Sequence, residues 1–247
     1  MSLFNKQINK DLQSQELPFV SAIIVAAGNS TRMGGVNKQF LLIDGVPVLI
    51  KTLRAFSDCA LISEIIISAR EQDIPDIYAM IKEFDIGKVK TIVKGGETRQ
   101  KSVFNAIECS SLNCDYLSIH DGARPLVTNK IIEDTILSSF NYGAAAAAVR
   151  VKDTIKVVNE NSIITGTPER SQLWAVQTPQ VFNKKLYLDA MSNVAGSESF
   201  TDDCKLIEDF GYNVHIVEGS YENIKITTPE DVIIAEAFIN RGENDEY

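Results

Sequence analysis

A loop of small residues with two nearby cations is the first feature of the sequence that suits chemistry. An apolar run is followed at once by Ala26-Ala-Gly-Asn-Ser-Thr-Arg-Met33 and, a few residues later, by Asn37-Lys-Gln39. Small residues let backbone N–H groups approach a phosphate, and Arg32 and Lys38 add positive charge. The segment matches neither G-x-G-x-x-G nor a P-loop. It predicts a phosphate site; a plain turn with solvated cations is the alternative.

A pair of glycines follows a later apolar run, in Gly95-Gly-Glu-Thr-Arg-Gln-Lys-Ser102. Gly95 and Gly96 allow a flat ligand to approach the backbone closely. Thr98 or Ser102 is able to cap the helix expected next or to hydrogen-bond a base. Taken alone, the segment is equally typical of an ordinary turn and helix start.

Another apolar run ends in the polar motif His120-Asp-Gly-Ala-Arg-Pro125. The Asp121 carboxylate suits a ribose hydroxyl or a metal ion, and the Arg124 guanidinium suits a phosphate. An Asp–Arg pair that only orders a loop is the alternative. His120 itself is predicted to be a core histidine and not a catalyst.

The remaining polar motifs are weak when each is taken alone. Lys and Arg on surface strands commonly serve solubility, and Gln, Thr and Asp commonly form turns and helix caps. These motifs are Asp153-Thr-Ile-Lys156, Arg170, Gln177-Thr-Pro-Gln180, Thr201-Asp-Asp203 and Asn223-Ile-Lys-Ile-Thr227. Their joint occurrence in this order is what makes them informative.

The composition places these motifs in an acidic globular protein. The 247 residues are 45% hydrophobic and 23% charged, with a formal net charge of -9. Such a chain is unsuited to a broad electrostatic grip on nucleic acid or an anionic membrane, so any anion site must be local. No apolar run reaches the roughly 18 residues that span a bilayer, and residues 1–17 are polar. The prediction is a cytoplasmic protein that binds neither nucleic acid nor membrane.

Cysteine and histidine are too sparse for the usual metal or nucleophile sites. The 4 cysteines, at positions 59, 109, 114 and 204, form no C-x-x-C pair, and the chain has 2 histidines. Zinc sites, redox motifs and histidine-based triads are therefore unsupported. The cysteines are predicted to be buried or inert thiols.

Alternating apolar runs and helical spacings indicate how the motifs are positioned. Phe19–Ala26 is a nearly continuous apolar run, typical of a strand buried on both faces. Strand and helix then alternate, which predicts an α/β fold with a mostly parallel sheet, helices on both faces and a ligand crevice at the carboxyl ends of the strands. Further expected strands are Glu64–Ser68, Lys90–Val93, Tyr116–Ile119 and Ala144–Val149, and expected helices are Val46–Phe56, Ile74–Phe84 and Gln100–Ile107.

This alternation is interrupted at residues 151–177, where no helix separates the expected strands. Asp153–Val158, Ile163–Thr165 and Leu173–Gln177 predict a β-hairpin arm. Two strands alone bury too little apolar surface to be stable in water. The arm therefore needs a partner surface, which a second subunit is able to supply.

The α/β alternation returns after Pro179 and ends in a helix that begins at Thr228. Thr-Pro-Glu-Asp combines an N-cap, Pro at the first helical position and an acid in the first turn. Before it we expect helices at Lys184–Met191 and from Thr201, and strands at Asn213–Val217 and Asn223–Thr227. The expected organisation is a polar extension over residues 1–17, one domain over 18–241 that includes the arm, and an acidic tail over 242–247.

Taken in order, the motifs resemble those of the 2-C-methyl-D-erythritol 4-phosphate cytidylyltransferases. The resemblance runs from about Ser21 to Phe238 and rests on A-A-G-x-x-x-R-M, N-K-Q, G-G-x-x-R-x-x-S-V, H-D-x-A-R-P, D-T-I-K, Q-T-P-Q-x-F, T-D-D and N-I-K-I-T-x-P-E-D. It implies a Rossmann-like single domain, a homodimer with exchanged arms, and a requirement for Mg²⁺. The implied reaction joins CTP to methylerythritol phosphate, a polyol phosphate, and gives 4-diphosphocytidyl-2-C-methyl-D-erythritol and pyrophosphate in isoprenoid precursor biosynthesis.

The resemblance also implies roles for single residues. Nucleotide binding falls to Ala26, Ala27, Gly28, Gly95, Gly96, Ser102 and Asp121, with Asp121 near the ribose and the metal. Arg32 and Lys38 would stabilise the transition state. Acceptor binding falls to Arg124, Thr154, Arg170, Thr178 and Lys225, of which Arg170 and Lys225 would orient the acceptor for attack. The sequence departs from the family at Ser30, where Gly is usual, and at Asn37, where Pro is usual.

The chemistry fits this distribution of residue types. A phosphate monoester has a second pKa of about 6, so the nucleophile is ionised near neutral pH and needs no general base. The obstacle is repulsion between the two phosphates, which cations and positioning overcome. A site rich in Arg and Lys and poor in His follows. Mg²⁺ would be held mainly by the triphosphate and water.

Three alternatives stay open at this point. A ribitol-5-phosphate cytidylyltransferase shares several motifs. A non-catalytic nucleotide-binding regulatory protein would keep the glycine loops, although the presence of Arg32, Lys38, Arg170 and Lys225 counts against it. An NAD-dependent oxidoreductase would need G-x-G-x-x-G and an acid at the end of the second strand, where this sequence has Arg70.

Overall fold

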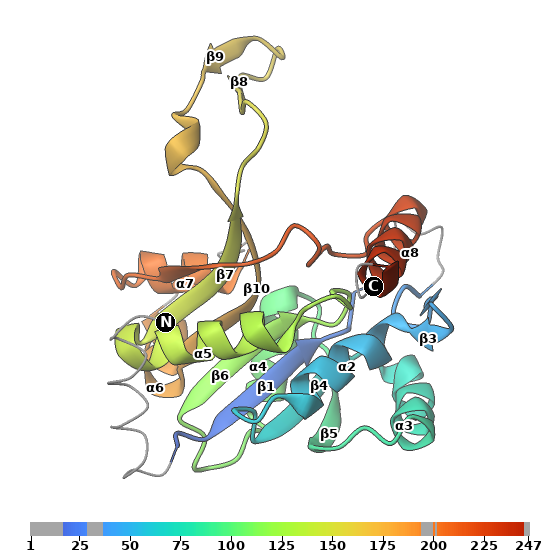
Figure 1. The fold of residues 1–247 in the computed structure, drawn as a ribbon. Coiled ribbons are helices and arrows are strands. Elements are labelled where there is room, and N and C mark those ends of the chain that lie inside the picture. Colours follow the sequence, from blue (N-terminus) through green and yellow to red (C-terminus); the bar gives the residue numbers. More distant parts are fainter. Residues whose placement is uncertain (1–16, 29–36, 194–199, 201, 245–247) are drawn as a thin grey trace, which may run out of the picture.

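A seven-stranded sheet forms the centre of the protein (Figure 1). The computed structural model describes residues 17–28, 37–193, 200 and 202–244. The strands lie in the order β11-β7-β10-β6-β1-β4-β5. Their bounds are β1 Val20–Val25, β4 Glu64–Ala69, β5 Val89–Lys94, β6 Tyr116–Asp121, β7 Ala144–Arg150, β10 Trp174–Asn183 and β11 His215–Glu218. The parallel pairs of β1 with β4 and β6, of β4 with β5 and of β7 with β11 confirm the mostly parallel sheet.

Helices cover both faces of this sheet, as predicted. Alternate residues of β1 face opposite sides. Ile24 packs in the cluster that holds Leu53 of α2 and Ile132 of α5, whereas Ile23 packs with Val103 of α4. The helices are α2 Val48–Asp58, α3 Ile74–Glu83, α4 Arg99–Ile107, α5 Asn129–Tyr142, α6 Lys184–Asn193, α7 Asp203–Asp209 and α8 Pro229–Asn244, with short 3-10 turns η2 Glu71–Asp73 and η3 Arg170–Gln172.

The two longest helices begin at caps of different kinds. Thr128 caps α5, a helix not named among the expected ones, by accepting a hydrogen bond from Ile131 N–H (3.3 Å). Pro229 is the first residue of α8, as predicted, and the Asp231 carboxylate accepts from the backbone N–H of Thr228 (2.8 Å). Acceptors at these positions satisfy N–H groups that have no partner inside the helix. α8 includes residues 242–244 of the expected tail, whereas residues 245–247 and 1–16 lie outside the described part of the chain.

The structure corrects two of the expected strands. Leu173–Gln177 is not a strand of the arm: from Trp174 onward it forms the start of β10, which is antiparallel to both β6 and β7. Trp174, Ala175 and Val176 pair with Arg150, Val149 and Ala148 of β7, so this run continues the central sheet and not the hairpin of the arm. Asn223–Thr227 is not a strand either. Its apolar alternation is satisfied by Ile226, which is buried against Ala123 and also hydrogen-bonds to that residue's carbonyl (2.8 Å).

The predicted arm is present but is shorter and more irregular than expected. It runs from Val151 to Leu173 and projects from the body (Figure 1). Its two strands are β8 Val157–Val158 and β9 Ile164–Gly166, and the 3-10 turn η3 follows them. Because β10 is antiparallel to both β6 and β7, these two strands run in the same direction. The arm therefore leaves the sheet at the same edge at which β6 ends in Asp121. In the described part of the chain, no helix is both long and apolar enough to span a membrane.

Candidate active site

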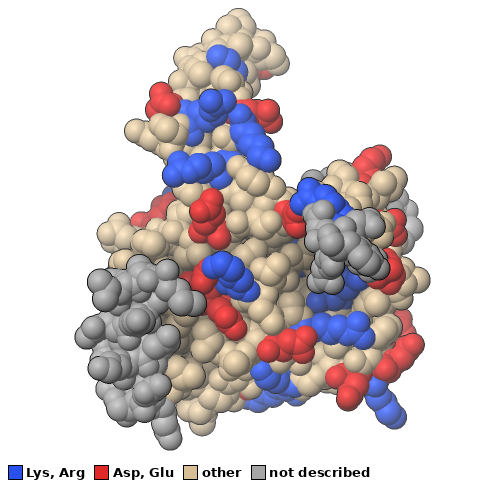
Figure 2. Space-filling model, viewed as in Figure 1, with Lys and Arg blue, Asp and Glu red and all other residues tan. Residues whose placement is uncertain are grey.

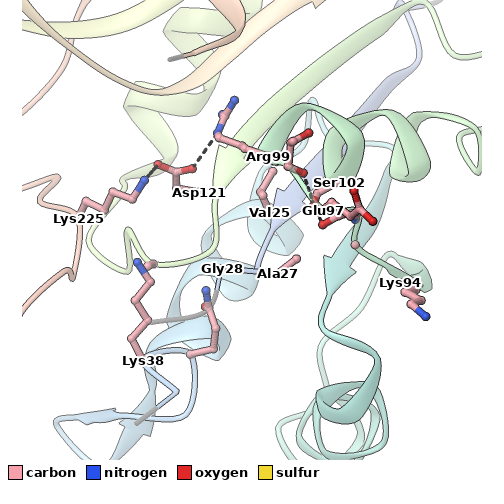
Figure 3. A pocket seen from close by; sticks show the side chains of 15 residues that line it. Val25, Ala27, Gly28, Lys38, Lys94, Glu97, Arg99, Ser102, Asp121 and Lys225 are labelled. Carbon is pink, nitrogen blue, oxygen red and sulfur yellow. Dashed lines mark hydrogen bonds and ion pairs between the residues drawn. The ribbon is translucent and has the colours of Figure 1, made fainter. Parts of the chain in front are cut away.

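A cavity of about 560 Å³ opens at the carboxyl ends of β1, β5 and β6 (Figure 3). The glycine loops and the cation of the first sequence motif meet here, although they lie far apart in the chain. Its lining includes Ala27, Gly28, Lys38, Lys94, Gly95, Gly96, Arg99, Ser102, Asp121 and Lys225. The crevice predicted from the α/β alternation is confirmed at this edge of the sheet.

A smaller cavity of about 230 Å³ adjoins the first one. Arg124 and Thr178, both predicted to bind the acceptor, line it. Arg99, Asp121 and Lys225 line both cavities, and Arg124 lies 3.9 Å from Asp121 on the side of the smaller one. We call these four side chains the shared wall. Two ligands bound on the two sides of this wall would meet beside these charged groups.

Asp121 is the electrostatic centre of the shared wall. Its carboxylate lies 2.7 Å from Lys225 Nζ, 3.7 Å from Arg99 Nε and 3.9 Å from Arg124 Nε. Burial by itself would raise the pKa of Asp121, but Lys225, Arg99 and Arg124 outweigh that effect and hold the pKa well below its usual range. Asp121 therefore stays ionised, and the wall carries three positive charges around one negative charge.

Arg99 belongs to a buried network that the sequence reasoning missed. Arg99 NH1 donates to Asp203 Oδ2 (2.6 Å), and Tyr187 donates its O–H to Asp203 Oδ1 (2.7 Å). Gln180 Oε1 accepts from the backbone N–H of Asp203 (3.1 Å). Burial would lower the pKa of Arg99, but the carboxylates of Asp203 and Asp121 raise it. Arg99 and Asp203 both stood in the motifs that carried the resemblance, which was the available signal.

The glycine loop after β5 holds its shape through its own hydrogen bonds. Ser102 Oγ accepts from Gly96 N–H (3.0 Å) and donates to Thr98 O (2.9 Å), while Thr98 Oγ1 caps α4 by accepting from Lys101 N–H (3.1 Å). A Cβ on Gly95 would lie 2.3 Å from Ala27 Cβ. Glycine is therefore required where the loop closes against β1. Ser102 is only 2% exposed and builds this loop.

The predicted core histidine is confirmed. His120 is fully buried beside Phe56, at 4.8 Å between ring centroids. Its Nε2 lies 3.4 Å from Arg124 O and its Nδ1 lies 3.0 Å from Thr178 Oγ1. A carbonyl only accepts, so Nε2 carries the proton and the Thr178 hydroxyl donates to Nδ1. Burial lowers the pKa of His120 to about 3, so it is neutral and unsuited to act as a proton donor at neutral pH.

Thr178 has a second hydrogen-bond partner besides His120. Thr178 Oγ1 also accepts from the backbone N–H of Asp121 (3.1 Å), so this hydroxyl positions the end of β6.

Cys59, Cys114 and Cys204 are buried, as predicted, and Cys109 is partly exposed. Burial raises the pKa of the three buried thiols, which keeps them protonated.

Some predicted site residues lie away from both cavities. Ala26 is 1% exposed and its N–H donates to Ser68 O (2.7 Å), so it does not line the larger cavity with Ala27 and Gly28. Thr154 and Arg170 lie on the arm and line neither cavity of this chain. The hydrogen bond of Arg170 is to Lys152 O (3.1 Å). Arg32 lies outside the described residues.

Comparison with known proteins agrees with the motifs at the cavity. A family model described as 2-C-methyl-D-erythritol 4-phosphate cytidylyltransferase matches residues 20–241. A relative of that name from Caldanaerobacter subterraneus is 48% identical over 226 residues, which cover 90% of this chain and 99% of the relative. One from Clostridium botulinum is 44% identical over 223 residues and covers 90% and 97%.

Solved structures give the same result. The 4-diphosphocytidyl-2C-methyl-D-erythritol synthase from Anaerococcus prevotii superposes with a TM-score of 0.81 at 34% identity, covering 90% of this chain and 96% of that one. The 2-C-methyl-D-erythritol 4-phosphate cytidylyltransferase from Thermus thermophilus gives 0.72 at 29% identity, covering 90% and 99%. With the family model spanning nearly the whole described chain, this protein belongs to the 2-C-methyl-D-erythritol 4-phosphate cytidylyltransferase family.

Proposed function

We propose that the larger cavity binds CTP and the smaller one binds 2-C-methyl-D-erythritol 4-phosphate. The products would be 4-diphosphocytidyl-2-C-methyl-D-erythritol, an isoprenoid precursor, and pyrophosphate. The observation that carries this assignment is the shared wall, where Arg99, Lys225 and Arg124 surround Asp121 between the two cavities. Two anionic substrates that must approach each other need a cationic wall of this kind.

The reaction needs positive charge and positioning more than proton transfer. An oxygen of the acceptor phosphate attacks the α-phosphorus of CTP, a new P–O bond forms, and the bond from the α-phosphorus to the bridging oxygen breaks. The electron pair leaves with pyrophosphate. The acceptor phosphate is ionised near neutral pH, because its second pKa is about 6. A neutral, buried His120 fits a site that uses no histidine base.

The described residues divide between the substrates by location. The loops at Ala27, Gly28, Gly95 and Gly96 would hold the nucleotide. Lys38 would lie beside the triphosphate and stabilise the charge that develops there in the transition state. We assign Arg32 the same role as Lys38 from the resemblance. Arg124 and Lys225 would bind the acceptor phosphate, and Lys225 would leave Asp121 to do so. Ala26 and Thr178 would act by shaping the backbone around the two sites.

The donor set suits Mg²⁺ held mostly by its substrate. Asp121 is the only carboxylate that lines both cavities among the residues described, and no group of three His, Cys, Asp or Glu forms a metal cage there. Mg²⁺ keeps several waters and commonly binds phosphates with one or two carboxylates. Asp121 would hold the ion together with the triphosphate. When bound, the ion would neutralise charge on the phosphates.

The arm is best explained as part of a homodimer with exchanged arms. Ile155, Val157, Val158, Ile163 and Ile164 are between 41% and 60% exposed on it. Basic side chains gather on the part of the arm nearest the body (Figure 2). Thr154 and Arg170 would then reach the acceptor site of the partner. We further propose that residues 18–241 form a single domain and that the acidic protein is cytoplasmic, without nucleic acid or membrane partners.

One assay tests the proposed function directly. Wild-type protein with Mg²⁺ and CTP should release pyrophosphate with methylerythritol phosphate and form a CDP-alcohol of the expected mass. Ribitol phosphate, tested in parallel, should be a much poorer acceptor. Equal or faster turnover of ribitol phosphate would contradict the acceptor, and binding of CTP without pyrophosphate release would support a regulatory protein instead.

A further inference from the structure

Lys38 reaches the larger cavity from a tight turn (Figure 3). Phe40 N–H donates to Asn37 O (3.1 Å), which closes a β-turn with Lys38 and Gln39 at its centre. Asn37 Oδ1 accepts from Gln39 N–H (3.1 Å) and closes a second, smaller ring around Lys38. An asparagine that bonds two residues ahead in this way mimics a backbone turn. The backbone on both sides of Lys38 therefore depends on Asn37.

The Asn37 side chain is itself anchored to the sheet. Its Nδ2 donates to Asp73 Oδ2 (2.9 Å), and Asp73 is only 5% exposed. Arg70 donates two hydrogen bonds to the same carboxylate, from Nε to Oδ2 (2.6 Å) and from NH2 to Oδ1 (3.0 Å). A two-pronged Arg–carboxylate pair fixes geometry as well as charge. Arg70 directly follows β4, so the chain of contacts runs from the sheet to Lys38.

Only a side-chain amide of this length satisfies both ends of the contact. The amide donates to Asp73 and accepts from Gln39 N–H with the same group. Aspartate in its place would keep the acceptor, lose the donor and face the Asp73 carboxylate with a like charge. Alanine would lose both hydrogen bonds. Asn37→Asp therefore removes the anchor and keeps the turn, whereas Asn37→Ala removes both.

We propose that Asn37 and Asp73, with Arg70, are positioning residues that hold Lys38 at the reacting phosphates. This inference rests on the proposed function, in which Lys38 stabilises charge in the transition state. A long lysine side chain reaches a fixed point only if its backbone is fixed. Misplacement of a catalytic group by about 1 Å costs up to about a hundredfold in rate.

The test compares kcat and KM for CTP in Asn37→Ala, Asn37→Asp and Asp73→Ala, each alone and combined with Lys38→Ala. Single-turnover reactions with excess enzyme follow the slow variants. We expect each single change to lower kcat by about tenfold to a hundredfold with less than about a threefold change in KM. In the Lys38→Ala background the same changes should leave kcat unaltered. Asp76→Ala removes an exposed carboxylate three residues from Asp73 and is the matched control.

Each outcome decides between distinct explanations. An equal loss of kcat in both backgrounds, or a raised KM with kcat unchanged, would mean that Asn37 only shapes the nucleotide cavity, and would overturn the inference. Normal kcat in all three single variants, with Lys38→Ala impaired, would overturn it while leaving the function of Lys38 intact. A fully active Lys38→Ala variant would contradict the proposed role of Lys38 and the inference with it. Melting temperatures measured for every variant separate these results from loss of folding.

Discussion

The shared wall and the arm differ in the surroundings of their side chains, which are paired and wholly or partly buried at the wall and exposed on the arm. At the wall, three cations surround the buried Asp121, and Arg99 has a second buried carboxylate in Asp203. On the arm, Val158 and Ile163 are 55% and 60% exposed, and Arg170 hydrogen-bonds to a backbone carbonyl. The wall is complete within one chain. The arm has side chains of the right kinds for an interface, and within the described part of the chain they stay exposed.

The shared wall and the arm are therefore stabilised at different stages. Buried charges are tolerated only when they are paired, so the wall must be pre-assembled as the chain folds. A two-stranded hairpin is at most marginally stable in water, so the arm depends on contacts made after folding. Changes at the wall should therefore affect the free energy of unfolding, and changes on the arm should affect assembly and activity.

The largest expected effect comes from testing whether the arm of one subunit completes the active site of its partner. In the proposed homodimer with exchanged arms, Arg170 acts at the partner's site, and the Arg170→Ala and Lys38→Ala proteins should each be nearly inactive. Mixing and reassociating the two variants creates heterodimers in which one site has both defects and the other has neither. Random pairing then restores up to about one quarter of wild-type activity, which a pyrophosphate-release assay measures.

The control for this experiment is proof that subunits have exchanged. Native mass spectrometry should detect the heterodimer at about half of the population. Heterodimers without recovered activity would reject the shared site and would mean that Arg170 and Lys38 act from the same chain.

Breaking the buried pair behind the wall should be the next largest effect. Asp203→Ala leaves Arg99 without its closest partner and should lower the free energy of unfolding by about 3 kcal/mol, measured by urea denaturation. Asp209→Ala is the matched control, because Asp209 lies on the same helix in an exposed pair with Lys205 and should cost less than about 1 kcal/mol. Similar losses in both variants would remove the distinction between wall and surface.

The pH dependence of stability should also report on the body. Burial lowers the pKa of His120 to about 3, whereas the unfolded value is about 6.5. Below pH 6.5 the unfolded chain gains a proton that the folded chain does not, so stability falls as the pH falls, by about 1.4 kcal/mol per unit. Above that pH the contribution is fully present.

A His120→Gln variant isolates this contribution. Between pH 4 and 6, the free energy of unfolding measured in urea should change less steeply with pH than in the wild type. The difference in slope should be about 1.4 kcal/mol per pH unit, which corresponds to one proton. Between pH 7 and 8 the two slopes should agree, because histidine is then neutral in both states. Equal slopes at low pH would mean that His120 in the folded protein gains its proton over the same pH range as in the unfolded chain.

The smallest effect on folding is expected at the tip of the arm. Replacing Val158 and Ile164 by Ser should change the free energy of unfolding of the body by less than about 0.5 kcal/mol. The same change should weaken the dimer, seen as a lower sedimentation coefficient on dilution. Leu112→Ser is the matched control, because Leu112 is fully exposed on the body and should leave assembly unchanged. Loss of the dimer in both variants would show that the arm has no special role.

Local sequence patterns predicted most of the strands and helices and the edge of the sheet at which the cavity opens. Apolar runs such as that before Gly28 predicted the strands, because a strand buried on both faces needs an uninterrupted run. The Thr-Pro-Glu-Asp cap predicted the start of α8, because capping is decided by a few neighbouring residues. The alternation of strands and helices predicted a crevice at the carboxyl edge of the sheet, because parallel strands end together there.

Which side chains contact one another depends on the packing of segments that are distant in the chain. Arg99 and Asp203 are 104 residues apart, and Asn37 meets Asp73 across 36 residues, so no local pattern pairs them. The same holds for β10, whose place between β6 and β7 depended on the partner surface and not on its own alternation. Periodicity is a property of neighbours in the chain, whereas ion pairs and strand order depend on how distant segments pack.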